Sequence, residues 1–135
     1  MTLGGIPESV RQFIFEHIDS VEQLEVLLLV RSKPSNEWSV DDVTKSLKTN
    51  LSSVANRLVR LKDLDLLEQT SADPALYRYK PKTTEIAAVV DLLSEAYAVR
   101  RHRVLELIFS PMKRARSFAD AFIVRGPPKS EDGDG

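Results

Sequence analysis

The stretch that decides the fold is SVDDVTKSLKTNLSSVANRLVRLKDLDLL, residues 39–67. Ser39 followed three residues later by Asp42 is an N-cap signature, and it predicts a helix of about two turns. Asn50 can cap a second helix over residues 51–62, because apolar residues recur there at spacings of three and four. That apolar stripe consists of Leu51, Val54, Leu58 and Leu61. Two short helices joined by a tight turn form a candidate helix-turn-helix.

The residues that follow predict a β-hairpin. Asp65 stands where the chain leaves the second helix, at a position that favours a left-handed backbone. Residues 66–70 predict one strand and residues 76–80 another, separated by turn chemistry. Alternation in the second strand places Tyr77 and Tyr79 on one face.

Helix, turn, helix and hairpin in this order resemble the winged helix-turn-helix of bacterial transcriptional regulators such as the MarR, PadR and ArsR families. The resemblance is carried by residues 39–43, by residues 53–67 and by the hairpin up to Tyr79. It implies a mainly helical protein with a small β-hairpin wing. It also implies that double-stranded DNA is the partner, read in the major groove by the helix over residues 51–62. In such regulators Gly usually stands where this chain has Asp65, and the wing is usually longer.

Two further helices are predicted upstream, over about residues 7–18 and 21–30. Ser20 and Gln23 form a capping box for the second of these, and Pro34 ends it. On this helix Glu22 and Glu25 are expected to lie in water, opposite the apolar side.

The C-terminal part predicts long helical structure. Thr83 can cap a helix, and residues 83–110 contain no Gly or Pro, so a single helix roughly 40 Å long is expected. A short final amphipathic helix starts at Pro111, and residues 126–135 have the composition of a disordered acidic tail. We therefore expect a winged-helix domain over residues 1–82, and dimerisation or partner-binding helices over residues 83–125. The excess length of the long helix favours a homodimer.

The candidate DNA-binding residues lie mainly on the polar side of the second helix-turn-helix helix. Asn56 could make a bidentate contact to adenine, Arg57 could reach guanine or a phosphate, and the remaining cations would contact phosphates. An ordinary solvated helix face is the alternative, since residues 38–82 carry eight basic and six acidic residues. The full candidate set is Lys48, Ser52, Ser53, Asn56, Arg57, Arg60, Arg78 and Lys80.

The densest positive charge is Arg-Arg-His-Arg at residues 100–103, inside a stretch, 97–125, with seven basic and two acidic residues. Three interpretations are open: a solvated helix side paired with the acidic first third of the chain, a DNA backbone contact, or a docking surface for an acidic partner. The last defines the alternative function, a winged-helix interaction module that binds a protein through residues 97–125.

Other classes of protein find little support in the sequence. The 135 residues contain no Cys, carry a formal net charge of −1, and contain no glycine-rich phosphate loop, nucleophile elbow or HExxH motif. We therefore expect no enzyme, no cofactor and no metal site, and the lack of a long apolar run predicts a cytoplasmic protein without membrane contact. Trp38, Tyr77 and Tyr79 could line a ligand pocket, but a core role is favoured.

Overall fold

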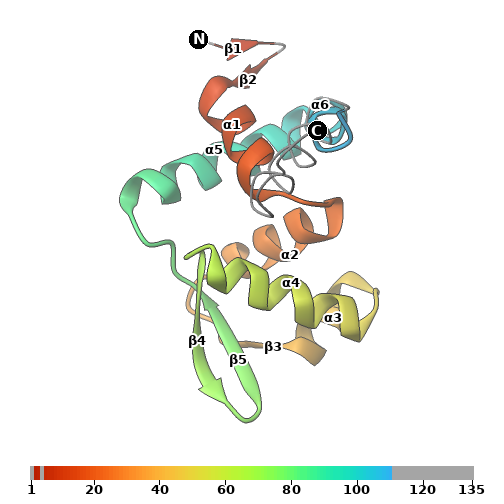
Figure 1. The fold of residues 1–135 in the computed structure, drawn as a ribbon, viewed down its shortest axis with the longest axis vertical. Coiled ribbons are helices and arrows are strands. Elements are labelled where there is room, and N and C mark those ends of the chain that lie inside the picture. Colours follow the sequence, from red (N-terminus) through yellow and green to blue (C-terminus); the bar gives the residue numbers. More distant parts are fainter. Residues whose placement is uncertain (1, 4, 111–135) are drawn as a thin grey trace, which may run out of the picture.

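The computed structural model describes residues 2–3 and 5–110. Six helices and five short strands are found in these residues (Figure 1). In chain order they are β1 (Thr2–Leu3), β2 (Ile6–Pro7), α1 (Glu8–His17), α2 (Val21–Ser32), β3 (Trp38–Ser39), α3 (Val40–Leu47), α4 (Leu51–Asp63), β4 (Leu67–Ala72), β5 (Ala75–Tyr79), α5 (Thr84–Val99) and α6 (Arg101–Ile108).

Helices α2, α3 and α4 and a small sheet form the winged helix-turn-helix within residues 1–82. Helix α4 packs against both α2 and α3, and β4 and β5 form an antiparallel hairpin that projects away from the helices (Figure 1). The strand order is β3-β5-β4, with Trp38 opposite Tyr77 and Leu67 opposite Tyr79. The predicted fold class is therefore confirmed. Strand β3 was not predicted, because its two residues are too few to show an alternating pattern.

The predicted helix starts are confirmed by their caps. The Ser39 hydroxyl accepts from the Asp42 amide and the Asp42 carboxylate accepts from the Ser39 amide, which completes a capping box at α3. Asn50 caps α4 and Thr83 caps α5 in the same way, each accepting a hydrogen bond from the amide three residues ahead. At α2 only half of the predicted box forms, since the Gln23 side chain donates to the carbonyl of His17 instead.

Among the residues that the structure describes, two that are not glycine adopt the left-handed conformation, and both redirect the chain around α4. Lys48, with φ of 56°, ends α3 and makes the tight turn into α4. Asp65, with φ of 63°, follows α4 and leads into β4, as its position in the sequence predicted. These two turns set the direction in which α4 crosses the molecule.

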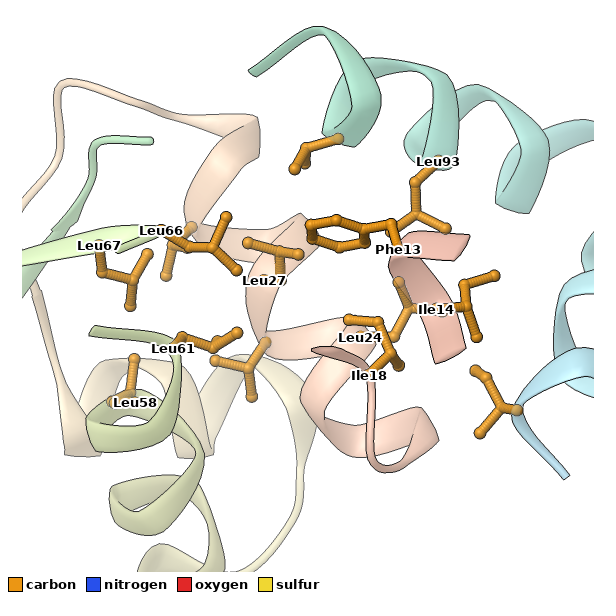
Figure 2. Close-up of a cluster of buried hydrophobic side chains, with 14 of the residues drawn as sticks. Phe13, Ile14, Ile18, Leu24, Leu27, Leu58, Leu61, Leu66, Leu67 and Leu93 are labelled. Atoms are coloured by element: carbon orange, nitrogen blue, oxygen red, sulfur yellow. The ribbon is translucent and has the colours of Figure 1, made fainter. Parts of the chain in front are cut away.

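One continuous core joins the winged helix to the other helices. Figure 2 shows buried side chains running from Leu58 and Leu61 on α4, past Leu27 on α2, to Phe13 on α1 and Leu93 on α5. Helix α4 therefore rests on a body that extends well beyond its two neighbouring helices.

The prediction of a single long helix over residues 83–110 is wrong. The chain leaves helical geometry at Arg100 (φ −129°, ψ 51°), and α5 and α6 are separate helices. The break lets Val104 and Ile108 on α6 turn back and become buried against α1, which a straight helix would not allow. Gly5 has a φ of 85°, which L side chains rarely adopt, and a Cβ there would lie too close to Nε of Arg100, so the Arg100 side chain would have to move to make room.

Part of the C-terminal prediction lies outside the described residues, namely the final helix from Pro111 and the tail over residues 126–135. At the other end, β1 and β2 pair as a small antiparallel ribbon that the sequence did not predict. In the portion of the chain that the structure describes, no helix is long and apolar enough to cross a bilayer.

Candidate nucleic-acid interface

Helix α4 buries one side and exposes the other. Val54, Leu58 and Leu61 are fully buried, as the apolar spacing predicted. Leu51 is the exception: it was expected in the stripe but is 54% exposed, and it is the first residue of the helix. Val59 is also half-exposed, so the outward side of α4 mixes apolar and polar side chains.

The polar residues of this outward side begin at the turn before the helix. Lys48, Ser52 and Asn56 are exposed, and their side chains make no hydrogen bond or ion pair with any other described residue. Ser52 and Asn56 lie one helical turn apart, near the N-terminal end of α4. That end of a helix is the part that reaches base edges when a helix lies in the major groove.

Two other predicted DNA-binding residues are turned toward the protein itself. The Ser53 hydroxyl donates to Oε1 of Glu22 on α2, and Nε of Arg57 donates to the same oxygen at 3.1 Å. The Thr49 hydroxyl donates to the other oxygen, Oε2, at 2.7 Å. We call Glu22, Thr49, Ser53 and Arg57 the Glu22 cluster.

The expectation that Glu22 lies in water is therefore wrong, and so is the placement of Ser53 and Arg57 on an open face. The Glu22 side chain is 21% exposed and that of Arg57 is 30% exposed. Burial acts to raise the pKa of the Glu22 carboxyl, but the hydrogen bonds from the two hydroxyls and from Arg57 outweigh it and hold the pKa below its ordinary value. Glu22 is therefore charged at neutral pH.

No short-range signal in the sequence could have found this cluster. Glu22 lies 31 residues from Ser53 and 35 from Arg57, and the contacts depend on how α2 and α4 cross. The same holds for Arg60, whose Nε lies 3.6 Å from a carboxylate oxygen of Asp19, just before α2. Both side chains of this pair are 49% exposed, so Arg60 remains accessible to a ligand.

The cations of the wing share one carboxylate. Arg78 donates from both Nε and Nη2 to Glu68 on the neighbouring strand, and Nζ of Lys80 lies 3.6 Å from the other oxygen of Glu68. The hydrogen bond from Arg78 holds the pKa of the Glu68 carboxyl below its ordinary value. With Asp73 in the turn of the hairpin, residues 67–80 carry two basic and two acidic residues, so the wing has no net charge and Lys80 is its most exposed cation.

The basic residues at 100–103 lie on the opposite side of the body from the wing (Figure 1). Arg101 lies 3.7 Å from Glu25 and stacks over the Tyr97 ring at 4.6 Å, so for this one residue the expected pairing with the acidic first third of the chain is found. Arg103 pairs instead with a carboxylate of its own helix. Docking of a protein through residues 97–125 stays a prediction, since residues 111–125 lie outside the described part.

The aromatic residues singled out in the sequence serve the core. Trp38 and Tyr77 are buried, and burial raises the pKa of Tyr79 to about 12. A hollow of about 310 Å³ does lie beside α1, but its apolar lining is formed by other residues, among them Phe13 and Ile86.

Comparisons with known proteins agree at the level of the fold. No known sequence family and no curated protein matches the chain. Among solved structures, wild-type MarR from Escherichia coli in its apo form is 16% identical, with a TM-score of 0.50, over 82% of this chain and 82% of that chain. BpsR from Bordetella bronchiseptica is 21% identical, with a TM-score of 0.50, over 87% and 80%. RV1404 from Mycobacterium tuberculosis is 18% identical, with a TM-score of 0.50, over 91% and 83%.

These similarities show that the chain has the winged-helix fold of MarR-type transcriptional regulators, as the sequence predicted. The structure of BpsR was described for the regulation of its DNA binding by 6-hydroxynicotinic acid. At these identities the shared feature is the fold alone.

Proposed function

We propose that this protein is a DNA-binding transcriptional regulator that places the outward side of α4 in the major groove. The observation that carries the proposal is the exposed pair Ser52 and Asn56 at the N-terminal end of α4, with no partner among the described residues. Both side chains are short enough for close approach, and the Asn56 amide can pair with the N6 and N7 edge of adenine. The fold of MarR-type regulators supports the same assignment.

Phosphate contacts would come from the cations that flank this face. Lys48 lies in the turn before α4 and Arg60 lies one turn beyond Asn56, while Arg78 and Lys80 lie on the wing. Such contacts position a protein on the duplex without reading its sequence. Exposed Val59, on the same side of α4, could contact a thymine methyl group.

We also propose that the regulator is a homodimer, joined through the outward side of α5 and the end of α6. Leu92 and Val99 on α5 are exposed, and with Pro7 they border a hollow of about 220 Å³. Phe109, after α6, is exposed as well. Glu95 and Arg100 line the same hollow, so the surface combines apolar residues with one charge of each sign. A two-fold interface uses the same patch on both subunits, so one such surface is sufficient to form it.

A salt titration tests the DNA surface. Wild-type protein should bind a generic duplex, and the Lys48→Ala/Arg60→Ala variant should show a plot of log affinity against log salt that is flatter by about 1.8, because each phosphate contact contributes about 0.9. Fluorescence anisotropy of a labelled duplex, recorded at several salt concentrations, measures the affinity and its salt slope for each protein. The matched control is Arg11→Ala/Arg103→Ala, which removes two positive charges from α1 and α6 and should leave the slope unchanged. Equal slopes for all three proteins would reject this face.

A further inference from the structure

The Glu22 cluster has the donors of an anion-binding site. The anion that they bind is the carboxylate of Glu22 itself. Two hydroxyls and one guanidinium donate to a single carboxylate at the N-terminal end of α4. Hydroxyls, arginine and helix N-termini are also the groups that most often hold DNA phosphates. The carboxylate of Glu22 therefore occupies the donors that a phosphate beside α4 would need.

We infer that Glu22 limits DNA affinity by holding Arg57 and the hydroxyls of Thr49 and Ser53 in competition with phosphate. This inference rests on the proposed function, since it concerns the edge of the same α4 surface. It assigns Glu22 as a positioning residue that acts through Arg57.

The position of Glu22 supports competition over a purely structural role. Of the Arg57 guanidinium only Nε is engaged with a described residue, and 30% of the side chain is exposed. The guanidinium can therefore rotate outward at the cost of one hydrogen bond. With Glu22 in place, the positive charge of Arg57 is balanced by a negative charge 3.1 Å away, and the pair presents no net charge to a phosphate.

The neighbouring ion pair between Asp19 and Arg60 also places a carboxylate in competition with phosphate. Asp19 lies 3.6 Å from Arg60, so both arginines of α4 have a carboxylate close to the start of α2. Glu22 differs from Asp19 in its lower exposure and in its three donors, and it is the stronger competitor.

The decisive variant is Glu22→Gln, which keeps the size of the side chain and removes its charge. Because Arg57 then becomes free to add one phosphate contact, the variant should bind a generic duplex about tenfold more tightly at 0.1 M salt, with a salt slope steeper by about 0.9. In the double variant Glu22→Gln/Arg57→Ala this gain should disappear, which assigns it to Arg57. Thermal unfolding followed by circular dichroism checks that each variant is folded.

Glu25→Gln is the matched control, because Glu25 lies on the same helix, one turn later, and contacts Tyr97 and Arg101 instead of α4. It changes the net charge equally and should give no comparable gain. If wild type binds and folded Glu22→Gln gains nothing over Glu25→Gln, or binds more weakly, the inference is overturned and the proposed function stands. If neither wild type nor Glu22→Gln binds duplex DNA at 0.05 M salt, the proposed function fails and the inference fails with it.

Discussion

Replacing Leu58 by alanine should lower the free energy of unfolding by about 2–5 kcal/mol. Leu58 is fully buried and belongs to the part of the core where α4 meets α2 (Figure 2). Truncation removes the contacts of three methyl or methine carbons and leaves a cavity, because the helices on either side are held by their own packing. Urea unfolding followed by circular dichroism measures the change.

The next residue supplies the matched control. Val59 is half-exposed, and Val59→Ala should change the unfolding free energy by less than about 0.5 kcal/mol. The contrast between two adjacent residues tests the orientation of α4 directly. Similar losses for both variants, or a larger loss for Val59→Ala, would mean that α4 is rotated about its axis and that a different side faces outward.

Val99→Asp should raise the dissociation constant of the proposed dimer at least 100-fold. Val99 is 72% exposed in the single chain, so the substitution costs the monomer almost nothing. In a two-fold dimer the new carboxylate is buried twice, at about 1.5 kcal/mol or more each, and a total of about 3 kcal/mol corresponds to a factor of about 100. Sedimentation equilibrium over a range of protein concentrations measures the constant.

The same charge placed elsewhere on α5 provides the comparison. Thr84→Asp lies in the first turn of α5, at its other end, where an added acidic residue is favoured by the helix dipole. It should leave the association unchanged. A wild-type chain that is monomeric at about 100 μM, or a Val99→Asp variant that associates as wild type does, would contradict the proposed interface.

The helices and the wing could be predicted because their signals are local. Caps such as Ser39 and Asn50, and apolar residues three and four apart, lie within a few positions of the structure they specify. Information of this kind placed the described helices before Thr83 within about two residues at each end. The left-handed Asp65 was equally a local feature, set by the end of α4.

What the sequence could not predict depends on packing between distant segments. The break at Arg100 is accompanied by burial of Val104 and Ile108 on α6, the helix that contacts α1, and such burial of apolar side chains stabilises the fold. Local propensity in residues 83–110, by contrast, favours one helix. The spacing of apolar residues within 83–110 carries no information about a contact of α6 with α1, which lies more than 80 residues earlier in the sequence.

Part of the candidate site could likewise be predicted from local sequence, and part of it could not. The polar side of α4 followed from helical periodicity, and Ser52 and Asn56 are exposed as that periodicity requires. Which of its cations are open depends on carboxylates from α2 and the residue just before it, and these can be found only when α2 and α4 are seen together. Arg57 was therefore placed on the correct helix, while its partner was missed.

The most direct test of the central claim is an NMR titration of ¹⁵N-labelled protein with duplex DNA at low salt. We predict that the side-chain amide signals of Asn56, and the backbone signals of residues 48–60 and 75–80, shift on binding. Signals of α6, over residues 101–108, should stay in place. Binding accompanied by shifts in α6, with the signals of Asn56 and α4 unchanged, would contradict the account.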